Sequence, residues 1–317
     1  MVKKLLTTLC CSLLVLATGC KDEKPAAPRQ AQQASVPTAL QDSPELSGEN
    51  AYVHCAALCA LGPRPSNSVA YEKQLVYLSE HLQKAGWRVR RESFTLSNGM
   101  LMTNLHAEYG AESAEPRPVL ISCHIDTKRG IRNFVGADDG ASAAALMLEL
   151  ARVLSAKPEL ASKVELLFFD GEEAFASRMS ETDGMYGSRY DVMRRKGKLP
   201  SWQINLDMVG GRNKMIAVPI LDTDARLMQF YTEGIEKLGF SHERWTIYPG
   251  SYLDDHQPYV RAGVPSINLI AYFSEGNWWH TSRDDMSRIC PHSLADSGRM
   301  VLYLLGRLVP EPAAENP

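Results

Sequence analysis

The 317-residue sequence has no excess of positive charge, no CxxC cysteine pair and no internal repeat. Its 34 lysines and arginines are outnumbered by 37 aspartates and glutamates, which gives a net charge of −3. Nucleic-acid binding normally demands a basic face, so we expect no nucleic-acid partner. The absence of a CxxC pair argues against a cysteine zinc site. The length and composition therefore fit a globular enzyme, since a hydrophobic content of 44% is ordinary for a globular fold.

The N-terminus has the layout of a bacterial export signal. Two lysines precede the apolar run Leu5–Ala17, which is shorter than the about 20 residues needed to span a bilayer. Small residues then lead to Cys20, and this arrangement resembles the lipobox of bacterial lipoproteins, in which the cysteine is acylated. We therefore expect residues 1–20 to be a lipoprotein signal peptide. The exported protein is then held on a bacterial membrane by the lipid alone, facing the periplasm, and Lys21 after the cysteine favours the outer membrane. The alternative is an ordinary signal peptide with an incidental cysteine.

Residues 21–50 are rich in Pro, Ala, Gln and Ser and contain no aromatic residue. Such a segment buries too little apolar surface to offset its ordering entropy, so we predict a disordered tether. A folded domain is expected over residues 51–309, followed by a disordered tail over 310–317. The domain contains four cysteines, whose pairing the spacing does not assign. We expect them to be small buried hydrophobic residues with at most one disulfide; they are Cys55, Cys59, Cys123 and Cys290.

Short apolar runs alternate with helical periods along the folded part. The predicted strands are 89–96 and 105–109 at the sheet edge, and 119–123, 164–169, 204–206 and 266–270 in its interior. The predicted helices are 71–84, 141–154, 223–238 and 292–308. Continuous apolar strands between helices indicate an α/β protein. We expect a three-layer sandwich with a central mixed, mostly parallel sheet flanked by helices.

Residues with metal-ligand side chains follow the predicted strands directly. In chain order they are His124 and Asp126, then Asp138 and Asp139 in a glycine-flanked loop, Asp170, Glu172 and Glu173, Asp207, and His280 after a tryptophan-rich loop. Parallel strands end at one edge of a sheet, where α/β proteins bind ligands. Carboxylates grouped there repel one another unless a cation neutralises them. Nitrogen and oxygen ligands without cysteine favour catalytic zinc with an open coordination position.

These segments resemble, in order and spacing, the M28 family of zinc peptidases. The matching segments are His124–Asp126, Gly136–Asp139, Phe169–Glu173, Asp207–Gly210 and His280. The resemblance covers roughly residues 51–308 and implies a zinc-exopeptidase-like α/β fold in one domain. For the two-zinc aminopeptidases of the family it implies His124 and Asp207 on one ion, Glu173 and His280 on the other, and Asp139 as the bridge. Glu172 is then the general base.

Further segments resemble the glutaminyl-peptide cyclotransferases within the same family. They are Ser122–Lys128, Phe134–Ala137, Phe168–Phe175, Tyr186–Arg189, Asp254–His256 and Trp279–Thr281. These enzymes convert an N-terminal glutamine to pyroglutamate and release ammonia. The resemblance implies a single zinc on Asp139, Glu173 and His280, with His124 behind these ligands.

The cyclotransferase resemblance also implies roles for four side chains. Glu172 carries the proton between the substrate amine and the departing nitrogen, and shares a proton network with Asp207 and Asp254. Asp254 contacts the amine, and Trp279 forms the apolar wall of a glutamine-sized pocket. The sequence departs from the animal cyclotransferases at Asn268, where they have histidine.

Three hypotheses follow from the sequence: a one-zinc cyclotransferase, a two-zinc aminopeptidase, and a non-catalytic M28-like ectodomain used for binding. The expected partners are the amino ends of peptides or proteins, and we expect a monomer. Surface or core roles are expected for the histidines outside the motifs, which are His54, His81, His106, His242 and His292.

Overall fold

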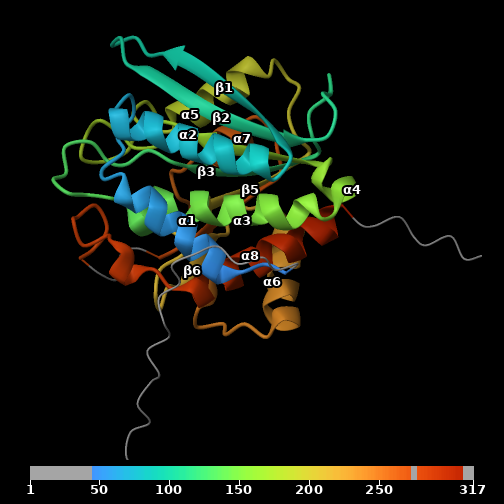
Figure 1. The fold of residues 1–317 in the computed structure, drawn as a ribbon. Coiled ribbons are helices and arrows are strands. Elements are labelled where there is room, and N and C mark those ends of the chain that lie inside the picture. The colour runs from blue at the N-terminus through green and yellow to red at the C-terminus, as the bar shows by residue number, and fades with distance from the viewer. Residues whose placement is uncertain (1–44, 273–276, 310–317) are drawn as a thin grey trace, which may run out of the picture. The chain divides into compact units, whose positions relative to one another are not determined.

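The computed structural model describes residues 45–272 and 277–309, and the predicted signal peptide, Cys20 and the C-terminal tail lie outside the described residues. Six strands form a mixed sheet in the order β1-β2-β4-β3-β5-β8 (Figure 1). They are β1 (Trp87–Thr95), β2 (Leu101–Tyr109), β3 (Val119–His124), β4 (Val164–Phe169), β5 (Trp202–Asp207) and β8 (Ser266–Ile270). Strand β2 runs antiparallel to both neighbours, whereas β4, β3, β5 and β8 are parallel. The predicted fold class is confirmed.

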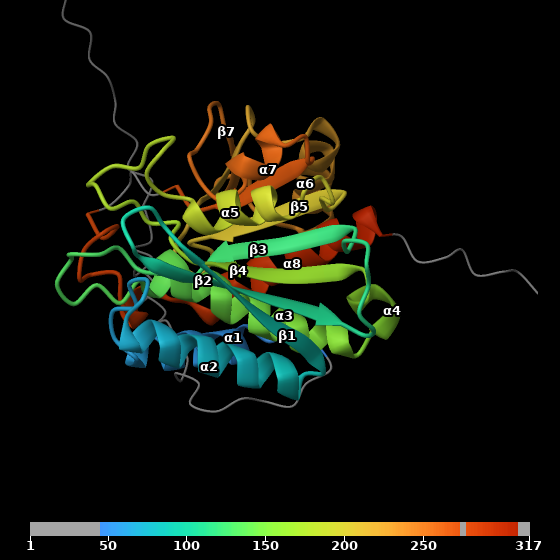
Figure 2. The same cartoon turned by 90° about the horizontal axis from the view of Figure 1, so that it is seen from above.

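Helices cover both faces of the sheet (Figure 2). On one face lie α1 (Gly48–Ala60), α2 (Val69–Lys84), α3 (Ala143–Ser155) and α8 (Pro291–Leu308), with α6 (Ala225–Leu238) packed against α8 and β8. On the other face lie α5 (Tyr186–Arg194) and α7 (Gln257–Arg261). Smaller elements are α4 (Pro158–Ala161), the π-helical turn η1 (Ala137–Ser142), the 3-10 turn η2 (Met286–Arg288), and the parallel pair β6 (Ile216–Pro219) and β7 (Trp245–Tyr248). Over residues 45–272 and 277–309, no helix combines the length and apolarity that crossing a bilayer requires.

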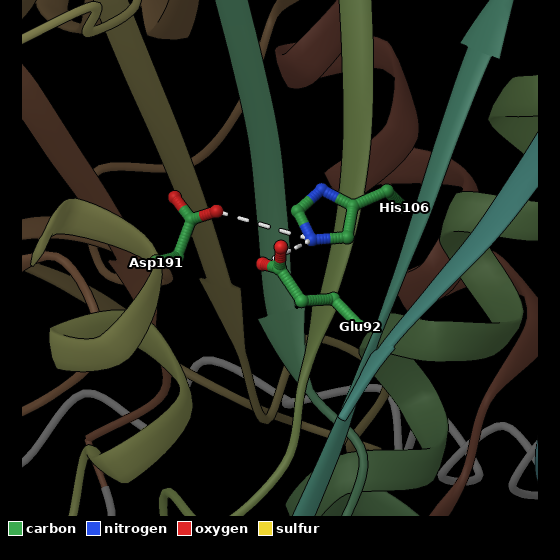
Figure 3. A group of neighbouring side chains, drawn as sticks. All are labelled: Glu92, His106 and Asp191. Atoms are coloured by element: carbon green, nitrogen blue, oxygen red, sulfur yellow. Dashed lines mark ion pairs between the residues drawn. The ribbon is translucent and has the colours of Figure 1, made fainter. Parts of the chain in front are cut away.

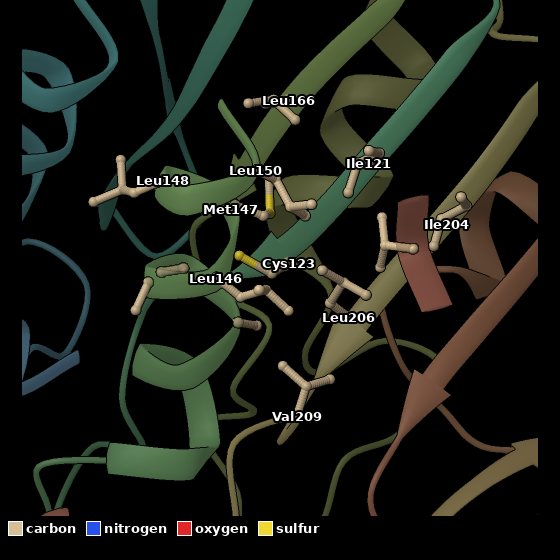
Figure 4. Packing of buried hydrophobic residues seen from close by; sticks show 14 of the residues in the cluster. Ile121, Cys123, Leu146, Met147, Leu148, Leu150, Leu166, Ile204, Leu206 and Val209 are labelled. Atoms are coloured by element: carbon tan, nitrogen blue, oxygen red, sulfur yellow. The ribbon is translucent and has the colours of Figure 1, made fainter. Parts of the chain in front are cut away.

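The central strands are buried on both faces, which explains their continuous apolar sequence. Along β3, Ile121 and Cys123 point toward α3 and join the main core (Figure 4). Leu120, the residue before Ile121, points the other way and packs with Phe169 and Tyr259 under α5 and α7. Successive side chains of a strand alternate between faces, so one apolar run serves two cores. The four domain cysteines are free thiols, and all but Cys290 are buried.

Two expectations about the edges of the domain need correction. Helix α1 begins at Gly48, inside the segment predicted to be a tether, because the Ser47 side chain caps it by accepting a hydrogen bond from the Asn50 amide. A Cβ on Gly48 would collide with the Pro291 carbonyl, so this glycine permits the close approach of α1 to α8. Strand β2, predicted to lie at the sheet edge, is paired on both sides. Its polar residue His106 is buried against Glu165 of β4.

Candidate metal centre

The predicted ligands Asp139, Glu173 and His280 meet at the carboxyl edge of the sheet. The His280 Nε2 atom lies 3.1 Å from Glu173 Oε1 and 3.4 Å from Asp139 Oδ2. Two atoms bound to one tetrahedral zinc at about 2.0–2.1 Å lie about 3.3 Å apart. The spacing of this group, which we call the first ligand group, therefore matches that of ligands sharing a zinc ion.

A second ligand group forms around His124, on the other side of Asp139. The His124 Nε2 atom is 3.2 Å from Asp139 Oδ1 and 3.2 Å from Asp207 Oδ1. Its Nδ1 atom is 3.2 Å from the backbone oxygen of Asp126, which orients the ring. Asp139 thus offers one carboxylate oxygen to each group, the arrangement expected of a bridging ligand.

The two groups differ in whether their buried carboxylate oxygens have a hydrogen-bond donor. Among the described residues, Asp139 Oδ2 and Glu173 Oε1 are buried oxygens without a hydrogen-bond donor, and both face His280. In the second group, the ring of His124 is within hydrogen-bond distance of Asp207 Oδ1. Buried oxygens left without a donor are costly unless a cation takes the donor's place. The first group therefore fits a bound cation, and its mixed nitrogen and oxygen donors suit zinc.

The position of Asp139 is fixed by an irregular turn before α3. Gly136 and Gly140 adopt φ values of 51° and 98°, a left-handed region open to glycine. The Asp284 carboxylate accepts hydrogen bonds from the backbone amides of Asp138 (2.8 Å) and Asp139 (3.0 Å). The turn is thereby held from a distant part of the chain. Sequence analysis did not identify Asp284, since its only signal is an aspartate four residues after His280.

The Glu172-Glu173 pair is held from the end of β3. The Asp126 carboxylate accepts hydrogen bonds from the backbone amides of Glu172 (3.1 Å) and Glu173 (3.3 Å). The ammonium group of Lys128, itself buried, lies 3.5 Å from Glu173 Oε2. One oxygen of Glu173 is therefore oriented by a cation while the other faces His280. Lys128 is a positioning residue that sequence analysis left without a role.

A cavity of about 250 Å³ opens beside the first ligand group. Its walls include Glu172, Asp207, Met208, Tyr252, Ile270 and Trp279, together with the three ligands. Trp279, which was predicted to form an apolar wall, is one of these lining residues: its ring stacks on His280 at 3.8 Å between centroids and remains 37% exposed. The volume lies below the about 300–1,000 Å³ of drug-sized pockets, so the cavity accommodates one residue of a peptide rather than several.

Burial raises the pKa of Glu172 well above its usual range. The negative charges of Glu173 and Asp254 raise it further, whereas His124 opposes the shift. Burial likewise raises the pKa of Asp207 to about 7, against the hydrogen bond from His124. A carboxyl group with a raised pKa is suited to accept a proton and return it near neutral pH.

Asp254, which was predicted to contact the substrate amine, lies deeper in the structure than Glu172. Its side chain is buried behind the cavity, where Oδ1 accepts from the Asn205 amide (3.2 Å) and Oδ2 from the Asn268 amide (2.6 Å). It is not among the described residues that line the cavity. Asp254 instead acts on Glu172 and Asp207 through its charge. Asn268, the position that departs from the animal cyclotransferases, is its hydrogen-bond partner.

The fold and the shared carboxylate define a metal-dependent enzyme with the architecture of an exopeptidase. The sequence model of Peptidase family M28 matches residues 104–305, and the chain belongs to this family. It is 32% identical to the glutaminyl-peptide cyclotransferase of Gloydius blomhoffii over 274 residues, which cover 70% of each chain. The resemblance predicted from the motifs is thus confirmed.

Solved structures with the same fold include two enzymes of different activity. A glutaminyl cyclase of Porphyromonas gingivalis matches with a TM-score of 0.75 and 26% identity, covering 83% of this chain and 99% of that one. A leucine aminopeptidase precursor of Bacteroides thetaiotaomicron matches with a TM-score of 0.72 and 24% identity, covering 84% and 99%. At that identity the second match concerns the fold alone.

Proposed function

We propose that this chain is a zinc-dependent glutaminyl-peptide cyclotransferase, which converts the N-terminal glutamine of peptides to pyroglutamate and releases ammonia. The observation that carries the proposal is the pair of donorless oxygens, Asp139 Oδ2 and Glu173 Oε1, facing His280 beside Glu172. The similarity to named cyclotransferases and cyclases supports the choice of reaction.

The proposed chemistry divides between the zinc and Glu172. Asp139, Glu173 and His280 would hold the zinc ion, which would supply the Lewis acid that polarises the γ-carbonyl of the substrate glutamine. The α-amine has a reference pKa of about 7.7–8.0, so little driving force is needed to remove its proton. Glu172 takes this proton as the new carbon–nitrogen bond forms, and returns it to the side-chain nitrogen that leaves as ammonia. Trp279 provides the apolar wall against which the glutamine side chain lies.

A two-zinc aminopeptidase is the second candidate, because the second ligand group is also complete. His124, Asp139 and Asp207 lie close enough to hold an ion together. One observation favours the single ion: His124 already satisfies Asp207 by a hydrogen bond, so the second group needs no cation to be stable. His124 then serves to orient Asp139 and Asp207.

The two reactions are separated by the products from a Gln-initiated peptide. We expect the purified full chain to release ammonia and to leave a peptide that keeps all of its residues. A coupled ammonia assay and mass spectrometry measure the two products. The matched control is the same peptide with an acetylated α-amine, which must not react because the nucleophile is blocked. Free glutamine in place of ammonia would identify an aminopeptidase, and no turnover of any peptide would favour a binding protein.

We also propose that the enzyme is exported and held on a bacterial membrane through acylated Cys20, with the outer membrane favoured. The support is the sequence alone: a charged start, a short apolar run, and small residues before the cysteine. Stable anchoring requires more than one acyl chain, which lipoprotein modification provides. Substitution Cys20→Ser is expected to abolish incorporation of labelled fatty acid during expression. Equal labelling of the variant and the unsubstituted chain would contradict the anchor.

A further inference from the structure

A third group of potential metal ligands lies outside the candidate metal centre and shares no residue with it. It consists of Glu92 on β1, His106 on β2 and Asp191 on α5. The strand register places His106 opposite Leu167 of β4, a residue of the core under α5 and α7. Figure 3 shows the Glu92 and Asp191 carboxylates facing the same nitrogen of the His106 ring, with both ion pairs drawn to that nitrogen. We call these three residues the third ligand group.

The distances in the third ligand group are somewhat longer than those of the first. The His106 Nε2 atom lies 3.4 Å from Glu92 Oε2 and 3.9 Å from Asp191 Oδ1 (Figure 3). One candidate ligand atom from each residue lies within 4.8 Å of the others. His106 is only 3% exposed, and within the described part of the chain its Nε2 atom has no hydrogen-bond partner of acceptable geometry. A buried imidazole nitrogen of this kind, aimed at two carboxylates, points to a missing partner between them.

The other polar atom of each residue is held by a neighbour outside the group. His106 Nδ1 lies 2.8 Å from Glu165 Oε1, a carboxylate that Arg195 holds through two hydrogen bonds of 2.9 and 3.0 Å. Metal-binding histidines commonly donate their second ring N–H to a carboxylate in this way, which fixes the ring and leaves the other nitrogen for the ion. The imidazole therefore has the orientation of a ligand.

The two carboxylates are oriented in the same manner. Glu92 Oε1 accepts hydrogen bonds from Arg90 (3.0 Å) and Arg194 (3.4 Å), whereas Oε2 faces His106. Asp191 Oδ2 accepts from Arg195 Nε (2.5 Å) and from the Tyr259 hydroxyl, whereas Oδ1 faces His106. Each carboxylate thus gives one oxygen to a fixed donor and presents the other to a common point.

The third ligand group is reached from solvent through an open groove of about 380 Å³. Glu92 and Asp191 line this groove together with the acidic residues Glu108, Glu115 and Glu165 and the basic residues Arg90, Arg194, Arg195 and Lys198. The three arginines are the donors to the outer carboxylate oxygens, so their charge is already paired.

We propose that Glu92, His106 and Asp191 form a further zinc site, whose ion ties α5 to strands β1 and β2. One nitrogen and two oxygen donors suit zinc, and water from the groove supplies the fourth position. The ion joins segments far apart in the sequence, so its binding stabilises the fold rather than the reaction. The competing arrangement is a protonated His106 that pairs with Glu92, Glu165 and Asp191 without any metal.

The test counts zinc in variants that lack both ligand groups of the candidate metal centre. Substitution Asp139→Ala removes the carboxylate that these two groups share, so zinc retained by this variant belongs elsewhere. We expect one zinc ion per chain in Asp139→Ala, measured by plasma mass spectrometry after titration of the metal-free full chain with zinc chloride and removal of unbound ion. Addition of Glu92→Gln is expected to weaken this binding by at least about tenfold.

The matched control is Glu108→Gln, which removes the same charge from the same groove. Glu108 pairs with Arg88 at 2.8 Å and is no member of the third ligand group, so its substitution is expected to leave the zinc count unchanged. If Asp139→Ala does not fold, the same comparison is made in the otherwise unchanged chain, where Glu92→Gln is expected to bind one zinc ion fewer than Glu108→Gln. Zinc is also expected to raise the melting temperature of Asp139→Ala, an effect that Glu92→Gln removes. Equal zinc counts in the Glu92→Gln and Glu108→Gln variants would overturn the proposal and leave the metal-free ion network.

Discussion

Substitution Glu172→Gln is expected to lower kcat for glutamine cyclisation by about 10²- to 10⁴-fold, the usual contribution of a general acid–base residue. Glutamine keeps the size of the side chain but cannot take the proton from the substrate amine. Glu172 belongs to neither ligand group of the candidate metal centre, so the zinc content is expected to stay as it was. Initial rates of ammonia release at saturating peptide, with zinc counted in the same samples, measure both quantities.

Asp254→Asn is the informative comparison for this variant, because Asp254 acts on Glu172 through charge alone. Its negative charge raises the pKa of Glu172, so its removal is expected to lower that pKa. Glu172 must be ionised to accept a proton, and the acidic limb of the kcat profile therefore moves to lower pH while turnover persists. Full activity of Glu172→Gln would show that the base is another residue.

The second large effect is expected from Glu173→Ala, which removes a ligand of the first group. We expect zinc affinity to fall by more than the about 10- to 100-fold typical of losing a residue that only orients a ligand. Cyclisation is expected to disappear with the metal. Competition with a chromophoric chelator measures the affinity, and the ammonia assay measures the activity.

Lys128→Gln provides the graded control for the loss of Glu173. Lys128 contacts Glu173 Oε2 at 3.5 Å and leaves Oε1 for the metal. Its substitution is expected to lower zinc affinity by about 10- to 100-fold, and therefore by less than Glu173→Ala. An unchanged zinc affinity in Glu173→Ala would mean that this carboxylate is not a ligand.

The sequence predicts the ligands because each follows a recognisable strand. The bounds of β4 and β8 are predicted correctly, since short, continuous apolar runs mark buried parallel strands. Parallel strands end together, so Glu173 and Asp207 could be assigned to one edge before any contact was known. His280 was placed at the same edge because it ends the tryptophan-rich loop that follows β8.

The residues that orient the ligands could not be predicted in the same way. Asp284 and Asp126 act on backbone amides of other segments, a relation that leaves no spacing pattern in the sequence. The burial of Asp254 depends on the direction of its side chain, which strand order does not determine. His106 was expected to have a core or surface role, since its partners Glu92 and Asp191 come from β1 and α5. Interior polar positions are paired by the packing of distant elements, which periodicity does not describe.

The bridging position of Asp139 has a consequence for how ions load. One carboxylate serves both imidazoles, so an ion at His280 and an ion at His124 draw on the same negative charge. Each occupant alters the dissociation constant of the other by an identical factor, as thermodynamic linkage requires. Because two dications repel each other, the first ion raises the dissociation constant of the second, and the two ligand groups fill one after the other. The stoichiometry of the enzyme is therefore set by the free zinc concentration around it as well as by its own residues.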